Sequence, residues 1–169
     1  MIRSLRSVFV WGCKHGFAVL AVFLVAGYGT TFLKSRPAQA DEAVDKLVQV
    51  ALSDVSLSQR LLALEALKVD GGESAVAGLK KIAEEGDLHV AAAACAQLGR
   101  TKSSGSKTGL KALLADTDLS NEVLIAAASA IAEHWKDRGD KGYLEDKSEG
   151  NETLEAHYAV LKTRVYGDE

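Results

Sequence analysis

The feature that most constrains this chain is an internal repeat with a period of about thirty-one residues. Four Ala- and Leu-rich segments follow one another at steps of 31, 33 and 30 residues. Their last apolar residues are Leu67, Leu98, Ile131 and Leu161. A second apolar position recurs between them at Leu47, Leu79, Leu110 and Leu144. Two interleaved helices that share one period predict an array of helix–turn–helix units, since such units bury their apolar faces against their neighbours.

Small residues recur inside the repeat. An Ala-x-x-Ala-Leu pattern begins at Ala63 and returns, with changes, at Ala94 and Ala127, whereas the fourth copy has His157. An acidic turn residue precedes what we take as the first helix of a pair, at Asp54, Asp87 and Asp118. This pattern resembles the short HEAT-like repeats of phycobilisome-lyase-type proteins and many bacterial scaffolds. The resemblance spans Asp41 to about Val165 and implies an all-α fold, an α-solenoid of about three and a half HEAT-like helix pairs.

The first forty residues differ from the rest of the chain. They contain five Lys or Arg and no Asp or Glu, and residues 16–33 form an uncharged, apolar stretch. Eighteen such residues are just enough to span a bilayer, and the preceding basic residues are typical of a signal peptide. We therefore predict one N-terminal apolar helix in a signal peptide or signal anchor over residues 1–40, and a repeat domain over residues 41–169. A small-x-small cleavage site lies at Ala38 and Ala40. An organelle presequence fits the composition as well.

Basic residues are more numerous before the apolar stretch than after it, which favours an N-terminus inside and a repeat domain outside the cytoplasm. We expect an inner-membrane anchor through residues 16–33, with the repeat domain on the periplasmic, extracytoplasmic or lumenal side. Cleavage at Ala40 would instead give a soluble periplasmic protein.

Charge and motifs exclude several classes of function. Residues 41–169 hold 23 Asp or Glu against 15 Lys or Arg, and an acidic surface repels phosphate backbones. We therefore predict no nucleic-acid binding. The two cysteines, Cys13 and Cys95, do not form a Cys-x-x-Cys pair, and no metalloprotease, serine-hydrolase or phosphate-loop motif occurs. From this we predict no metal, no cofactor, no catalytic residue and no enzymatic activity.

Aromatic residues are absent between Asp41 and Glu133 and return near the C-terminus as Trp135, Tyr143, Tyr158 and Tyr166. Trp and Tyr are enriched where proteins meet their partners, so these four are candidate partner contacts. The other interpretation is that they seal the open end of the stack. The sequence thus predicts a non-catalytic protein–protein interaction module, a small membrane-associated subunit or scaffold of a membrane or extracytoplasmic complex. The alternatives are a soluble exported assembly factor or chaperone and, by the resemblance, bilin-lyase-like chromophore attachment.

Overall fold

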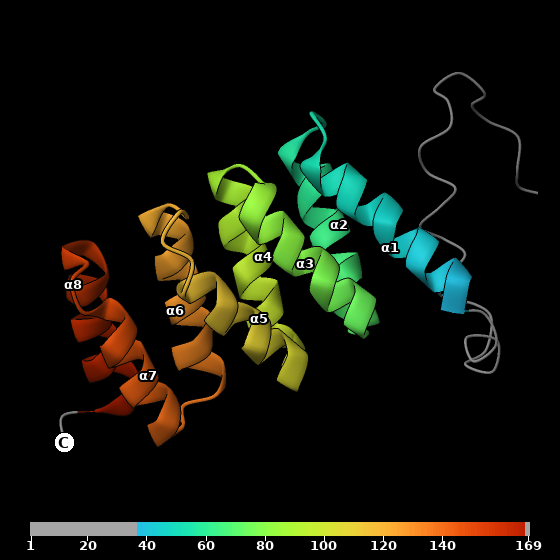
Figure 1. The fold of residues 1–169 in the computed structure, drawn as a ribbon. Coiled ribbons are helices and arrows are strands. Elements are labelled where there is room, and N and C mark those ends of the chain that lie inside the picture. Colours follow the sequence, from blue (N-terminus) through green and yellow to red (C-terminus); the bar gives the residue numbers. More distant parts are fainter. Residues whose placement is uncertain (1–36, 168–169) are drawn as a thin grey trace, which may run out of the picture. The chain divides into compact units, whose positions relative to one another are not determined.

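Eight α-helices, followed by one turn of π-helix, make up the residues that the structure describes, 37–167 of this computed structural model (Figure 1). The helices are α1 Pro37–Leu52, α2 Leu57–Asp70, α3 Glu73–Glu85, α4 Leu88–Thr101, α5 Ser104–Leu114, α6 Asn121–His134, α7 Arg138–Ser148 and α8 Glu152–Leu161, with the π-helix η1 over Lys162–Tyr166. These residues contain no strand. The prediction of an all-α fold is confirmed for this part of the chain.

The start of α1 lies close to the predicted domain boundary. The compact unit begins at Pro37, at the first helical position, where proline is well tolerated. The predicted cleavage site at Ala38 and Ala40 therefore falls within the first turn of α1. The apolar stretch 16–33 lies outside the described residues. Among residues 37–167, no helix is both long enough and apolar enough to cross a membrane.

The helices form two layers, with the odd-numbered helices in one and the even-numbered helices in the other (Figure 1). Helix α3 packs between α1 and α5, and α4 packs between α2 and α6. The pairs are α1/α2, α3/α4, α5/α6 and α7/α8, which makes four pairs in the described residues where the sequence predicted about three and a half. Because α1 opens the first pair, Asp54, Asp87 and Asp118 precede the second helix of a pair, and the prediction that they precede the first helix is wrong.

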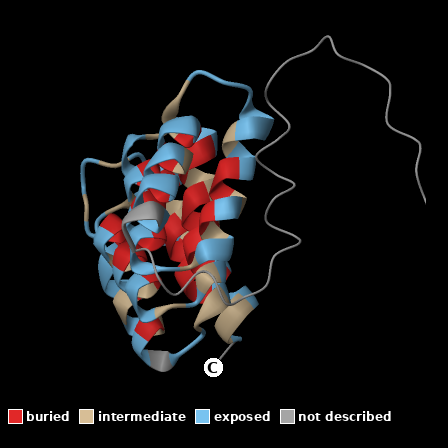
Figure 2. Ribbon diagram, turned by 90° about the vertical axis from the view of Figure 1, so that its right-hand side faces the viewer, coloured by how far each residue is buried: buried red, intermediate tan, exposed pale blue. Residues whose placement is uncertain are grey.

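The core confirms the period read from the sequence. Leu67, Leu98, Ile131 and Leu161 are all fully buried, one on each even-numbered helix. The buried residues lie on the helix faces that meet in the middle of the stack (Figure 2). At one contact the packing requires glycine, because a Cβ on Gly99 of α4 would lie 2.5 Å from Cδ2 of His134 and 3.1 Å from Cβ of Ala130, both on α6. The small residues thus let neighbouring helices of one layer approach closely.

The turns between pairs have one backbone feature in common. One residue in each of these turns adopts the left-handed conformation: Gly71 (φ 63°) and Lys102 (φ 53°) directly follow α2 and α4, and Lys136 (φ 51°) is the second residue after α6. This conformation stops the helix and turns the chain toward the next pair. Glycine adopts it without strain, whereas the two lysines do so at a cost of about 1 kcal/mol or more each. At the other end of α2, Ser56 and Gln59 form a capping box.

Candidate binding groove

All turns within a pair lie along the same edge of the stack, because the two helices of each pair run antiparallel (Figure 1). This edge is rich in carboxylates, all of them exposed or half exposed. We call it the acidic edge, and its members are Asp54, Glu84, Glu85, Asp87, Asp116, Asp118, Glu122, Glu149 and Glu152. The opposite edge, at the turns between pairs, carries the exposed basic residues Arg100, Lys102 and Lys136. The edge of the within-pair turns is therefore strongly acidic, whereas the opposite edge carries both signs, with Asp70, Glu73 and Asp137 beside these basic residues.

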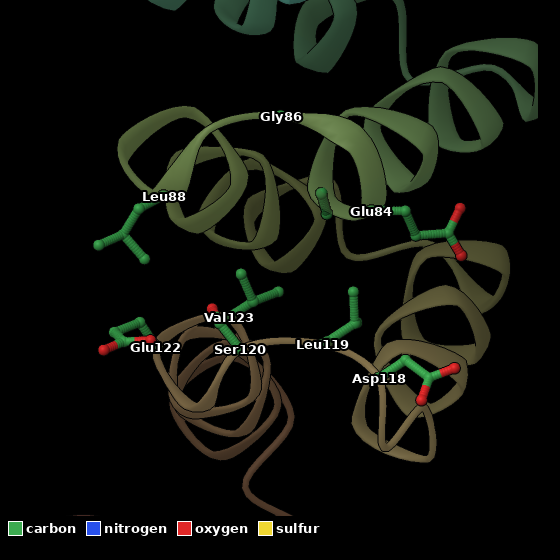
Figure 3. Close-up of a pocket in the computed structure, with 9 residues that line it drawn as sticks. Glu84, Gly86, Leu88, Asp118, Leu119, Ser120, Glu122 and Val123 are labelled. Carbon is green, nitrogen blue, oxygen red and sulfur yellow. The ribbon is translucent and has the colours of Figure 1, made fainter.

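A pocket of about 370 Å³ opens on the acidic edge, between the α3–α4 turn and the α5–α6 turn (Figure 3). Its apolar part consists of Ala83, Leu88, Leu119 and Val123. Carboxylates stand at both ends: Glu84 and Asp118 lie at one end of the pocket and Glu122 at the other (Figure 3). The combination of an apolar floor and a charged rim suits a ligand that is itself part apolar and part cationic.

Local backbone chemistry explains the shape of the pocket. At Gly86 a Cβ would lie 2.6 Å from the carbonyl oxygen of Ile82, so only glycine permits this tight exit from α3. Asp87 then caps α4 by accepting hydrogen bonds from the backbone N–H groups of His89 and Val90 at 3.1 and 3.2 Å. This short turn leaves Leu88 45% exposed at the mouth of the pocket.

The carboxylates of the acidic edge differ in how far they are neutralised. Arg60 forms an ion pair with Asp87 and, together with the backbone bonds from α4, holds the pKa of that carboxyl below its usual value. Glu84 pairs with Lys80. Asp118 and Glu122 form no salt bridge with any residue that the structure describes. These two carboxylates, at opposite ends of the pocket (Figure 3), therefore have no counter-ion among the described residues.

The four aromatic residues predicted as partner contacts lie at the C-terminal end of the stack and do not line this pocket. The hydroxyl of Tyr143 donates to the carbonyl of Lys111 at 2.8 Å, and that of Tyr158 donates to the carbonyl of Lys141 at 2.9 Å. Tyr158 is only 5% exposed, and burial raises the pKa of Tyr166 to about 12. Trp135 is half-buried and packs against the core. Their role as partner contacts stays a prediction.

A buried carboxylate that the sequence did not reveal lies in the same region. Asp140 of α7 is 1% exposed, and its oxygens lie 2.6 Å from Nζ of Lys107 and 2.9 Å from Nζ of Lys111, both on α5. The two ammonium groups thus neutralise the buried carboxylate through salt bridges. Lys107 also donates to Asp137 at 2.7 Å. Burial lowers the pKa of Lys107, but the two carboxylates more than offset this and raise it above its ordinary value.

A serine and a histidine also meet where the sequence gave no signal. Ser129 of α6 and Nε2 of His157 on α8 are 2.8 Å apart, and burial lowers the pKa of His157. A hydroxyl beside a neutral imidazole is the arrangement that activates a serine nucleophile. Ser129, however, lies in the middle of α6, where the backbone N–H groups bond to helix carbonyls and leave no donors for an oxyanion. The pair links two helices, and it explains why His157 replaces the alanine of the other repeats.

Neither a metal cluster nor a reactive thiol is found among residues 37–167. They contain no group of three His, Cys, Asp or Glu side chains arranged to hold a metal ion. Cys95 is fully buried, which raises the pKa of its thiol to about 12. Its side chain packs as a small apolar residue of the core.

Comparison with known proteins gives one informative likeness. No protein-family model and no curated protein matches the sequence. Among solved structures, human deoxyhypusine hydroxylase in complex with glycerol is similar, with a TM-score of 0.62 and 19% sequence identity. The aligned part covers 76% of this chain and 45% of the hydroxylase chain, so this chain spans less than half of that protein's length. At this identity the likeness shows the fold alone, a helical-repeat solenoid.

The likeness corrects the functional prediction from the sequence. The chain was predicted to be a non-catalytic interaction module and not an enzyme, whereas the similar structure is that of an enzyme. This prediction is therefore wrong as an inference from the fold, because a stack of helix pairs is compatible with catalysis. The comparisons supply no phycobilisome-lyase-type relative, and that resemblance stays a prediction.

Proposed function

We propose that the helix-pair domain binds an extended, Lys- or Arg-rich segment of another protein along its acidic edge. The observation that carries this proposal is the pocket with an apolar floor and carboxylates at both ends. Binding of a protein segment along this edge would serve an enzyme that acts on the segment as well as a protein that only binds it.

A Lys or Arg side chain fits the pocket in both its parts. Its aliphatic stem packs on Leu88 and Leu119, while its charged head reaches Asp118 or Glu122. The volume of about 370 Å³ is near the lower end for ligand sites, which suits a single side chain better than a large small molecule. Because Asp118 and Glu122 have no counter-ion within the described domain, a bound cation gains a charge-assisted contact without displacing an existing ion pair.

The repeat sets the spacing of the basic residues. Neighbouring helices of a layer lie about 10 Å apart, so successive turns of the acidic edge follow at about this distance. A segment in the polyproline II conformation advances about 3.1 Å per residue with three residues per turn, so every third side chain lies on the same face and would meet the next turn. The bound segment is expected to carry Lys or Arg at every third position.

A binding measurement with the full chain in detergent tests the proposal. A labelled peptide with Lys at every third position is titrated by fluorescence anisotropy, beside a peptide with Glu at the same positions. The double variant Asp118→Asn/Glu122→Gln is expected to weaken binding of the Lys peptide about tenfold, from roughly 0.5–1 kcal/mol per lost charge. The wild-type affinity should also fall as salt is added.

A matched control separates the pocket from charge in general. Glu73 is an exposed glutamate in the first turn of α3, as Glu122 is in α6, but it lies on the opposite edge. Glu73→Gln should leave the affinity unchanged. Equal weakening by Glu73→Gln and by the double variant, or equal binding of the Glu peptide, would refute the proposed groove.

We also propose the location and the repeat type. The acid-free first forty residues support an anchor through residues 16–33, or cleavage at Ala40, with the domain on the extracytoplasmic or lumenal side. The Ala-x-x-Ala-Leu pattern supports the short HEAT-like subtype. The mass of the mature chain distinguishes the two forms: a mass that begins at Asp41 means cleavage, and one that begins near Met1 means an anchor. A protein found wholly in the cytoplasmic fraction would contradict both.

A further inference from the structure

A half-buried histidine joins the C-terminal ends of two neighbouring even-numbered helices. The ring of His134, in the last turn of α6, lies against Gly99 of α4, where a Cβ would stand 2.5 Å from Cδ2 and 3.2 Å from Nε2 of the ring. Burial lowers the pKa of His134, so the ring is neutral at physiological pH. This contact brings together the turn that follows α4 and the turn that follows α6.

Three exposed cationic side chains lie around this ring. Arg100 is in the last turn of α4, Lys102 directly follows α4, and Lys136 is the second residue after α6. The charge of each lowers the pKa of His134 further, while Glu133 acts in the opposite direction. Charges act in this way only over short distances, so all three cations are close to the ring. We call Arg100, Lys102 and Lys136 the basic cluster.

The basic cluster is not neutralised within the described domain. Its three members form no salt bridge with any residue that the structure describes. The nearest carboxylates already have partners, since Glu133 pairs with Arg164 and Asp137 pairs with Lys107. Asp70, in the preceding turn of this edge, accepts a hydrogen bond from a backbone N–H of its own turn at 3.2 Å. The cluster therefore presents uncompensated positive charge at the surface.

Two of the three cations stand on strained backbone. Lys102 and Lys136 have φ values of 53° and 51°, in the left-handed region that glycine adopts without strain. Gly71 takes this conformation in the preceding turn of the same edge. Glycine would serve the other two turns better than lysine does, so the turn alone does not account for either lysine. Strain of this kind is concentrated at positions whose side chains have a function.

We propose that the basic cluster binds a phosphate group between the ends of α4 and α6. The dipoles at the C-terminal ends of these helices offset about half a charge each, which leaves about two positive charges to be balanced. A phosphate monoester carries nearly two negative charges and has three acceptor oxygens, so it matches the cluster in charge. The ammonium and guanidinium groups donate charge-assisted hydrogen bonds to these oxygens.

The phosphate group can belong to a soluble monoester or to a lipid headgroup, because both present the same oxygens. The basic cluster lies on the edge opposite the acidic edge. The site therefore does not depend on the proposed binding of a basic segment.

Nuclear magnetic resonance of the histidine rings in the full chain tests the site. Inorganic phosphate is added to the protein in a neutral detergent at slightly alkaline pH, with the ionic strength held constant by sodium chloride. A bound dianion favours the protonated ring, so the signal of His134, assigned through His134→Gln, is expected to move saturably toward its protonated position. The midpoint should lie in the millimolar range, because contacts between exposed charges are weak. The signals of His89 and His157 should stay in place.

Matched variants separate the basic cluster from charge in general. The double variant Lys102→Gly/Lys136→Gly removes two of the three cations and relieves the strain in both turns, so it should fold at least as stably as the wild type. It is expected to weaken phosphate binding about tenfold. The control is Lys81→Gln, because Lys81 is exposed on α3 and has no salt bridge in the described part of the chain. This control should leave the midpoint unchanged.

A second titration identifies the source of the phosphate group. Phosphatidate is mixed into the detergent micelles, with phosphatidylcholine as the control lipid. A shift of the His134 signal with phosphatidate alone assigns the site to a lipid headgroup, and a shift with both phosphatidate and inorganic phosphate assigns it to phosphate groups of either source. No saturable shift with either compound, or equal midpoints for the wild type and the double variant, would overturn the proposal.

Discussion

Replacing Asp140 by asparagine tests how the last helix pair is joined to the stack. The substitution keeps the size of the side chain and removes the charge that faces Lys107 at 2.6 Å and Lys111 at 2.9 Å. Asp140 is 1% exposed, so no water replaces the lost attraction on its side. The domain is therefore expected to lose stability at the contact between α5 and α7.

The magnitude follows from the burial of the partners. Removing one member of a fully buried ion pair costs about 3–5 kcal/mol. The side chains of Lys107 and Lys111 are 23% and 32% exposed, so both ammonium groups regain part of their hydration, and Lys107 keeps Asp137 as a partner. We therefore expect a loss of about 2 kcal/mol. For a domain of this size, that is a fall of about 7 °C in melting temperature.

Thermal denaturation followed by circular dichroism at neutral pH measures the effect. The control is Glu145→Gln on the same helix, since Glu145 pairs with Lys162 at 3.3 Å and both side chains are largely exposed. An exposed pair contributes at most about 1 kcal/mol. If Asp140→Asn shifts the melting temperature no more than Glu145→Gln does, the buried ion cluster is not what holds α7, and the reasoning fails.

Three further predictions concern the backbone, the core and the charges. Lys102→Gly should raise the free energy of unfolding by about 0.5–1 kcal/mol in urea denaturation, because glycine adopts the left-handed turn without strain; a decrease would contradict this. Ala94→Leu, at a fully buried position between helices, should lower it by about 1–3 kcal/mol, whereas Ala156→Leu at an exposed position should change it little. Lys107 holds the pKa of Asp137 at about 2, below its ordinary 3.8, so this carboxylate stabilises the fold above about pH 4 and loses that effect as the pH falls toward 2. Asp137→Asn should therefore show a smaller fall in melting temperature than the wild type between about pH 5 and about pH 2.5; an equal fall would argue against this pairing.

The repeat was predictable because helix burial imposes it. An apolar residue such as Leu98 must return to the same face of each successive helix, and small residues such as Ala94 must return where helices cross, so both leave a period in the sequence. The order of the pairs was less accessible. The spacing at Leu47 indicates a helix there but not which helix opens a pair. Because α1, which contains Leu47, pairs with α2, each helix assumed to be the first of a pair is the second.

The buried polar contacts left no such trace. Asp140 lies in a polar stretch, and nothing in its neighbours along the chain indicates that two lysines on α5 neutralise it. The pair of Ser129 and His157 depends in the same way on the packing of α6 against α8. The acidic composition of the domain was visible, but the alignment of the within-pair turns, with their carboxylates, along one edge follows from the antiparallel pairing.

The failed prediction on catalysis has a similar cause. The repeat is set by the buried positions, which specify the fold and are compatible with any chemistry. The absence of known motifs adds no information about those positions. The positions that carry chemistry in such a stack are those that the repeat leaves unconstrained, chiefly the turns. The residues that define the repeat therefore bear least on whether the chain is an enzyme.

Deviations from the period are more informative about function than the period itself. The step from Leu98 to Ile131 is 33 residues, two more than the preceding step. Helix α5 has 11 residues where α3 has 13, so the addition lies in the α5–α6 turn, which runs over residues 115–120 where the α3–α4 turn has only Gly86 and Asp87. This longer turn supplies Asp118, Leu119 and Ser120 to the pocket. The α5–α6 turn is therefore longer than the packing of the helices requires. It forms one wall of the groove that we propose to bind a basic segment.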